Sequence, residues 1–290
     1  MNMQNDEGYI GCYYHVATGN AYVLMMAIEH YRYTRDKEWL HTIRDRLIPI
    51  ADNLIRRIEV SKTADPNSRG CGLISGRIGD VADSLSTYMF SAAAWSALDG
   101  LSELLSVLDD PEYARIDTVA QELRSNILRS LDIAFAEAPL LPLSDGSWVP
   151  AMSTYAEHKA PVCLHAESEF TRGSHMSIES SAGMAYLLHY GLIPKEHPYY
   201  EMILDLHNEL YTAYGCAFQQ AFSFPYDRFH LRQGNVSAFL HEYYSTMAAT
   251  SDRETYYFLE GYDRNGEAKL NEQAMWCMQT RRMLFMEEGS

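Results

Sequence analysis

The stretch from Gly72 to Leu101 reads GLISGRIGDVADSLSTYMFSAAAWSALDGL and joins a loop pattern to a helix pattern. Its first half is punctuated by glycine and carries Asp80 and Asp83, a composition typical of a loop. From Thr87 onward almost every residue is apolar or small, which predicts a helix buried on all sides. The stretch therefore predicts a loop that brings two acids to the start of an inner helix.

The same alternation of an apolar helix and an amphipathic helix recurs along the chain. Residues 21–31 are apolar all round, whereas residues 38–59 place apolar side chains three and four positions apart with charges opposite. Further pairs are predicted at 87–105 with 113–135, at 177–192 with 198–214, and from 236 to the closing amphipathic segment 272–288. Repeated helix pairs predict a mainly α protein in which outer helices wrap inner ones. Short strands are predicted only near 146–152 and 159–166.

The predicted connections between these helices fall into two classes. Those from inner to outer helices are short, at about 34–37, 108–111, 192–197 and 250–253. Acids such as Asp36, Asp110 and Asp252 stand there, as suits a helix N-terminus. Those from outer back to inner helices are long and span 60–86, 136–176 and 214–235. If the pairs stack side by side, the long connections meet at one end, which we call the rim, and loops of that length are usually functional.

Composition limits the class of protein. The 290 residues, 47% of them hydrophobic, suit one globular domain over 1–290 with a large core. A formal charge of -16 argues against a nucleic-acid partner and favours a neutral or cationic ligand. No segment has the length and apolarity of a membrane span, so no membrane partner is expected. The five cysteines are spread without a pairing pattern, which indicates neither a disulfide framework nor a zinc site.

The start of the chain has neither a basic region nor an apolar core of a signal peptide, so a complete chain of this sequence would be cytoplasmic. The first residues read as the middle of a loop, which favours a portion of a longer protein. We therefore keep open a missing upstream domain and a homo-oligomer. No dinucleotide, phosphate-loop or metal-ligand motif is present in the sequence, so no cofactor is predicted.

An inner ring of apolar helices inside an outer amphipathic ring resembles the (α/α) toroid of the six-hairpin glycosidase superfamily. The sequence of residues 72–98 is similar to that family's loop and inner helix with an Asp and a Tyr. The sequence of residues 27–40 is similar to the family's junction between two helices. The end, 279–288, is like the segment that leads from the family's last helix into a further domain. The resemblance implies a toroid of helical hairpins, here an incomplete α-α barrel because fewer helices are predicted than the family's plan requires. It also implies a carbohydrate substrate.

Glycoside hydrolysis needs two carboxyl groups beside the scissile bond, and aromatic rings stack on sugar faces. The carboxylates expected to be catalytic are Asp80, Asp83, Glu169 and Glu260. The residues expected to bind the substrate are Tyr9, His15, Arg77, Trp148, Arg172, His175, Glu179, Tyr226 and His230. Most of these residues lie in or beside the long connections, whereas Tyr9 and His15 belong to the loop at the start of the chain and Glu260 to its last predicted turn. The three histidines of loop 136–176 lack the helical spacing of metal ligands.

Three alternatives stay open at this point. Asp80 and Asp83 can act as caps of the following helix instead of as catalysts. A polysaccharide lyase on a related toroid would use Tyr155 and His175 as base and acid, with Arg172 neutralising a uronate, although the acidic charge counts against a polyanionic substrate. A helical-repeat scaffold would bind a protein or glycan without catalysis.

Overall fold

The computed structural model describes residues 4–11, 19–62, 65–76, 85–160, 184–209, 230–231, 234–258 and 270–286. The chain divides into two compact units, one of 1–138 with 153–159 and the other of 139–152 with 160–290. We call them unit 1 and unit 2 and describe each by itself. The described residues are mainly helical, which confirms the predicted class. The single domain over 1–290 and the toroid stay predictions.

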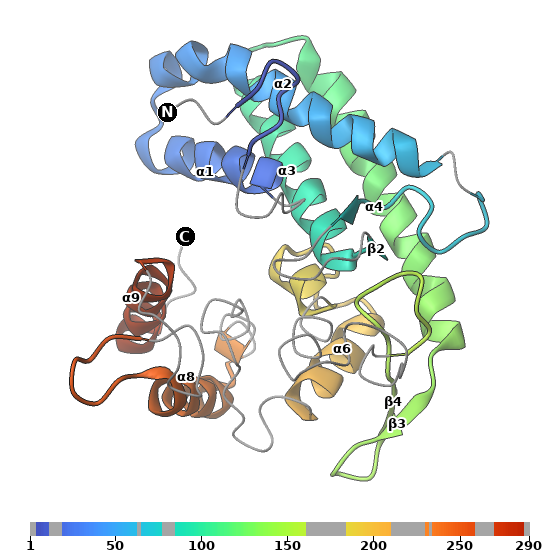
Figure 1. The fold of residues 1–290 in the computed structure, drawn as a ribbon, viewed down its shortest axis with the longest axis vertical. Helices are drawn as coiled ribbons and strands as arrows, with labels where there is room; N and C mark the ends of the chain where they lie inside the picture. Colours follow the sequence, from blue (N-terminus) through green and yellow to red (C-terminus); the bar gives the residue numbers. More distant parts are fainter. Residues whose placement is uncertain are drawn as a thin grey trace. The chain divides into compact units, whose positions relative to one another are not determined.

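Unit 1 contains two helical hairpins (Figure 1). The first joins α1 (Gly19–Thr34) to α2 (Lys37–Lys62), and the second joins α3 (Tyr88–Val107) to α4 (Glu112–Glu137). The α3 helix contacts both α1 and α4, and α2 contacts α1 and α4. Gly100 lets α1 and α3 approach closely, because a Cβ there would lie 2.9 Å from Ile28 Cδ1. The predicted pairing of inner helices with outer amphipathic ones is thus present in unit 1.

The two inner helices of unit 1 differ in burial. The α3 helix is buried as predicted, and its exposed residues lie in its last two turns. The prediction that α1 is buried on every side is wrong, because Tyr22, Met26 and Tyr33 are 40%, 71% and 64% exposed. Within unit 1 the packing partners of α1 are α2 and α3, which cover only part of its surface. An apolar sequence shows that a helix is stabilised by packing against other elements, but it does not show how many elements pack on it.

Three of the four predicted short connections are confirmed. The Asp36 carboxylate accepts a hydrogen bond from the Trp39 amide (2.9 Å) at the start of α2. Asp110 accepts from the Glu112 amide (3.0 Å) at the start of α4. In unit 2, residues 184–189 are helical, and α6 (Tyr199–His207) begins directly after Pro198. Acids therefore satisfy free amides at the starts of α2 and α4, as the sequence suggests.

The fourth short connection, at 250–253, is wrong. The α8 helix (Val236–Thr250) ends there, but the next described helix is α9 (Leu270–Phe285). Asp252 accepts from the amides of Glu254 (3.0 Å) and Thr255 (2.7 Å), and Ser251 pairs with Phe258 in an antiparallel bridge. Asp252 closes a local turn and does not cap a helix. An aspartate side chain can accept hydrogen bonds from nearby amides in either structure.

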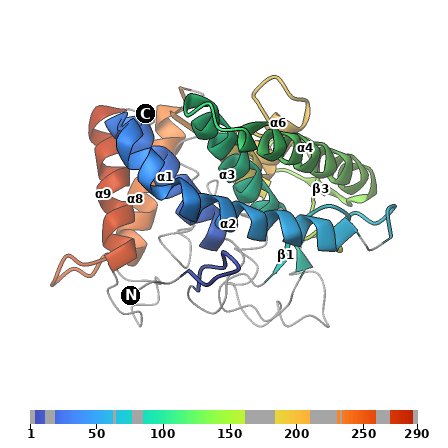
Figure 2. The same ribbon diagram turned by 90° about the horizontal axis from the view of Figure 1, so that it is seen from above.

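Unit 2 combines a small hairpin with helices. Strands β3 (Leu140–Pro142) and β4 (Trp148–Pro150) pair antiparallel, which confirms the strand predicted at 146–152. The strand predicted at 159–166 falls almost wholly outside the described residues. The hairpin packs on α6, and α8 lies beside α9 (Figure 2), where Tyr243 and Trp276 form a core with Phe258 against it. Among the described residues no helix has the length and apolarity to span a membrane.

Candidate functional site

The rim of unit 1 begins at a short pair of strands in front of α3. Strand β1 (Ser75–Gly76) pairs antiparallel with β2 (Leu85–Ser86), with Gly76 opposite Leu85. Gly76 and Leu85, which flank the segment 77–84 with Asp80 and Asp83, are therefore neighbours across the two strands. Asp80 and Asp83 themselves lie outside the described residues. The β1–β2 pair fixes the base of this loop immediately before α3 begins.

The N-cap of α3 is Thr87. Its Oγ1 accepts a hydrogen bond from the Phe90 amide (3.0 Å), and its backbone is extended, as N-cap residues require. The alternative in which Asp80 or Asp83 is the N-cap of this helix is therefore wrong. The N-cap position is occupied by the threonine directly before the helix and not by one of the two acids farther upstream.

A second long connection meets the first at this point. Thr87 pairs with Tyr155 in an antiparallel bridge, the Tyr88 amide donates to the Thr154 carbonyl (3.1 Å), and Ala156 donates to the Ser86 carbonyl (2.9 Å). Both carboxylate oxygens of Glu157 accept from the Ser86 amide, at 2.9 and 3.1 Å. Segments of connections 60–86 and 136–176 thus lie together, which confirms the predicted convergence for these two connections.

Two arginines hold the converging segments through backbone carbonyls. Arg69 donates to the carbonyls of His158 (2.9 Å) and Glu157 (3.1 Å), and its side chain is only 11% exposed. Arg129 of α4 donates to the carbonyl of Cys71 (2.8 Å) and to that of Ser68 (3.3 Å). Hydrogen bonds from a charged donor are stronger than neutral ones. The base of the loop that carries Asp80 and Asp83 is therefore tied to both α4 and connection 136–176.

The sequence pattern did not predict Arg69, Arg129 or Glu157 as residues of the site. The single signal for Arg69 is its place in the glycine-rich stretch RGCGL, since such stretches make tight turns whose carbonyls need donors. Gly72 confirms that turn, with φ of +76°. Arg129 stands on an amphipathic helix, where an arginine looks like an ordinary surface residue.

Two tyrosines near this point are shielded from water. The Tyr88 hydroxyl lies 2.8 Å from Ser130 Oγ. Burial raises the pKa of Tyr88 to about 12, so its phenol is neutral at physiological pH. Tyr155 is 1% exposed, and its ring lies edge-on to His158 at 6.0 Å between centroids. A base in a lyase must reach its substrate, so the burial of Tyr155 counts against the lyase alternative.

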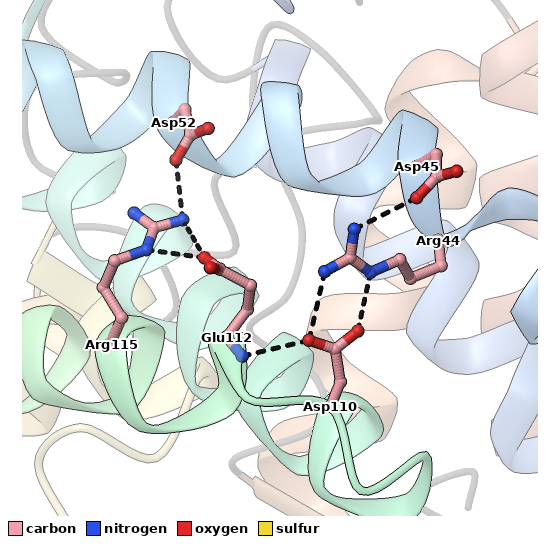
Figure 3. A network of polar contacts seen from close by, with 6 residues as sticks. All are labelled: Arg44, Asp45, Asp52, Asp110, Glu112 and Arg115. Carbon is pink, nitrogen blue, oxygen red and sulfur yellow. Dashed lines mark hydrogen bonds and ion pairs between the residues drawn. The ribbon is translucent and has the colours of Figure 1, made fainter.

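The opposite end of the same helices carries a different network, which we call the short-connection network (Figure 3). Arg44 of α2 donates to both carboxylate oxygens of Asp110, from Nε at 2.6 Å and from Nη2 at 3.1 Å. Arg115 of α4 lies 2.8 Å from Asp52 and 2.6 Å from Glu112. Hydrogen bonding from Arg44 lowers the pKa of Asp110. This network joins α2 to α4 and has the character of a structural brace.

Three of the predicted substrate-binding residues are described. Tyr9 lies under the Arg57 guanidinium of α2, 5.9 Å from the ring centroid. Trp148 is 61% exposed on β4, and His230 is fully buried in unit 2. The other predicted site residues lie outside the described residues: Asp80, Asp83, Glu169, Glu260, His15, Arg77, Arg172, His175, Glu179 and Tyr226. Their roles stay predictions, as do those of the three described residues.

Unit 2 contains a buried group of titratable side chains. His230 Nε2 lies 3.7 Å from Glu242 Oε2 of α8, beyond hydrogen-bond distance, and both side chains are buried. Burial lowers the pKa of His230 to about 4. Burial and then the nearby His230 lower the pKa of His207 of α6 to about 3. Both imidazoles are therefore neutral at physiological pH. Among the described residues no group of His, Cys, Asp and Glu is arranged to hold a metal ion.

The comparisons with known proteins add no relative. No family model matches the chain, and neither a curated protein nor a solved structure shows significant similarity to it. The class of protein that the chain represents is therefore inferred from its own residues and geometry. The resemblance to the six-hairpin glycosidases accordingly enters below as part of a proposal.

Proposed function

We propose that the chain is a carbohydrate-active protein, specifically a glycoside hydrolase with paired carboxylates on the rim of an (α/α) arrangement of helical hairpins. The observation that carries the proposal is the meeting of two long connections at the start of α3. There the β1–β2 pair closes the base of the loop with Asp80 and Asp83, and Glu157 and Arg69 tie that base to the next connection. A loop that carries two acids and has such a base suits a reaction that needs two carboxyl groups.

The charge of the chain agrees with this proposal. A net charge of -16 favours a neutral substrate over a uronate or a nucleic acid. In the proposed reaction a protonated carboxyl group donates to the leaving oxygen, while an ionised one activates water or attacks the sugar carbon. Asp80, Asp83, Glu169 and Glu260 are the candidates for these two roles, and no cofactor is needed for either.

Replacement of the four acids by their amides, one at a time, tests the proposal. The full chain is screened for hydrolysis of neutral aryl glycosides and neutral oligosaccharides, and active substrates are then used on each variant. We expect two of the four variants to lose at least about 100-fold in kcat, the range typical of a removed acid or base. Their thermal midpoints should stay at the wild-type value, because an amide conserves shape.

Glu122→Gln is the matched control. Glu122 lies on α4 and pairs with Lys62 at 2.7 Å, with half of its side chain exposed, and such surface pairs contribute little. This variant should keep full turnover. If no neutral glycoside is hydrolysed and no neutral sugar raises the thermal midpoint, the scaffold alternative replaces the proposal. If uronate polymers yield unsaturated products, the lyase alternative does.

A further inference from the structure

The two faces of the β3–β4 hairpin have different surroundings. Leu141 pairs with Val149, and both pack with Leu143 and with Leu206 of α6. Since side chains alternate between faces along a strand, the neighbouring pairs belong to the opposite face. That face consists of Leu140, Pro142, Trp148 and Pro150, and we call it the hairpin platform.

The hairpin platform is apolar although it faces solvent. Leu140 is 63% exposed and Trp148 is 61% exposed. Of the four tryptophans in the chain, Trp39 and Trp95 are half-buried and Trp276 is 3% exposed. An antiparallel sheet packed on one side normally presents polar residues on the other. Contiguous exposed apolar residues of this kind mark a binding surface.

The prolines limit how a partner can bind. Pro142 and Pro150 have no amide proton, and each strand has only three residues. A peptide that adds as an extra strand needs a row of free donors and acceptors, which proline interrupts. The prolines and the packing on α6 also keep the platform stiff. The ligand therefore contacts the face of the hairpin instead of extending the sheet.

The size of the hairpin platform argues against a protein partner. Four side chains, two of them prolines, present on the order of 300 Å² of apolar surface. A stable protein interface needs about 800 Å² from each partner. A surface of this size matches one or two rings of a small, rigid ligand.

The chemistry of the hairpin platform selects a neutral ligand with hydroxyl groups. None of its four side chains is charged, and the flat indole of Trp148 offers an apolar face. The turn that joins the two strands contains a carboxylate, Asp145. Hydrogen bonds from the Ser147 hydroxyl and amide, both to Asp145 Oδ1, lower the pKa of Asp145, so this carboxylate is ionised at neutral pH. A carboxylate has about four lone-pair sites in all, so it can also accept from ligand hydroxyls.

We infer that the hairpin platform is a saccharide-binding site in which the Trp148 ring stacks on the apolar face of a neutral pyranose, with Asp145 accepting from sugar hydroxyls. The site takes no part in bond cleavage. The preference for a sugar over other neutral ring-shaped ligands rests on the proposed function. The position of the site rests on the hairpin alone.

Acrylamide quenching of tryptophan fluorescence tests this inference directly. The full chain carries Trp39→Phe and Trp95→Phe, so that the exposed Trp148 and the buried Trp276 are the tryptophans that remain. Cellohexaose, maltohexaose, xylohexaose and mannohexaose are titrated separately. We expect at least one to reduce the quenching constant twofold or more at saturation. Calorimetric titration should then show at least tenfold weaker binding for Trp148→Ala and a smaller loss for Leu140→Ala.

Tyr256→Ala is the matched control, because Tyr256 is an 82% exposed aromatic residue of the same unit. Its affinity should equal that of the parent chain. Protection by none of the four oligosaccharides overturns the inference, and so does an equal loss in Tyr256→Ala. A dimer that dissociates in Trp148→Ala, seen by light scattering, would instead assign the platform to a second copy. Protection of Trp148 by an oligosaccharide is a binding measurement that needs no turnover, whereas the amide variants of the four acids are read by hydrolysis, so the two proposals succeed or fail separately.

Discussion

The two compact units keep polar side chains away from water in different ways. In unit 1, Arg44 and Asp110 are ionised partners at hydrogen-bond distance, and Arg69 donates to two carbonyls. In unit 2, His207 and His230 are buried in the neutral state, because burial lowers the pKa of each. A buried titratable group is thus either ionised beside a partner of opposite charge or kept in its neutral form. This difference also predicts that acid affects the two units differently.

Acidification should give the largest effect and should be confined to unit 2. The pKa values of His207 and His230 are about 3 and about 4, against 6.5 ordinarily, so the unfolded chain binds more protons below pH 6.5. Stability is therefore complete above pH 6.5 and falls by on the order of 1 kcal/mol per pH unit for each histidine as the pH drops toward 4. Hydrogen exchange of α6 and α8 peptides at pH 7, 6 and 5 measures this loss.

Unit 1 provides the internal control for that experiment. The pKa of Asp110 is lowered in the folded state, so the stability that it contributes is present above its ordinary pKa and is lost only below about pH 4. Peptides of α3 and α4 should keep their protection between pH 7 and 5. His230→Asn should flatten the acid slope in unit 2. An equal loss in both units would contradict the comparison.

Asp110→Ala should give the next largest effect, now in unit 1. It removes the two bonds to Arg44 and the cap on the Glu112 amide. We expect a loss of about 2 to 3 kcal/mol in the free energy of unfolding, measured by urea denaturation. Asp110→Asn keeps an acceptor for the cap and should lose roughly half as much. Equal losses in the two variants would show that the ion pair matters and the cap does not.

Arg69→Met should act locally on the rim. The variant removes the two hydrogen bonds to the carbonyls of Glu157 and His158 but keeps most of the apolar length of the side chain. We expect about 1.5 kcal/mol less protection of amides in 72–76 and 85–87 by hydrogen exchange. Protection in the middle of α2 should be unchanged. Uniform loss across unit 1 would show that Arg69 supports the whole unit and not this loop base.

Arg115→Ala should have the smallest effect. Its side chain is 42% exposed, and its partners Asp52 and Glu112 are 37% and 33% exposed. Water and salt screen such pairs, so the loss in the free energy of unfolding should be about 0.5 kcal/mol and should shrink in high salt. A loss as large as that of Asp110→Ala would show that the short-connection network acts as one unit.

Much of the helical architecture was predictable, because the period of apolar residues is a local property. The bounds predicted for the helices now called α2, α3 and α4 lie within a few residues of those observed, and Asp36 and Asp110 cap the helices as expected. The turn at Asp252 was not predictable, since the same side chain caps helices and closes turns. The exposed face of α1 depends on neighbours far away in the sequence.

The candidate site was predictable only in outline. The length of the connections indicated that they were functional, and two of them do meet in front of α3. Which side chains hold them together was not visible, since Arg69, Arg129 and Glu157 act on backbone groups up to 89 residues away. Backbone carbonyls look alike in every sequence, so no pattern identifies the ones that an arginine will bind.

The sequence alone predicted that the chain forms paired helices and that acids in short turns cap two of them. It also predicted that the acidic charge disfavours anionic partners. Those properties follow from side-chain period, local hydrogen bonding and composition. Only the tertiary structure decided that Thr87 caps α3, that Trp148 stays in solvent and that His230 is buried. The physical reason is that burial and long-range hydrogen bonds depend on which segments meet, and that is a property of the packed chain.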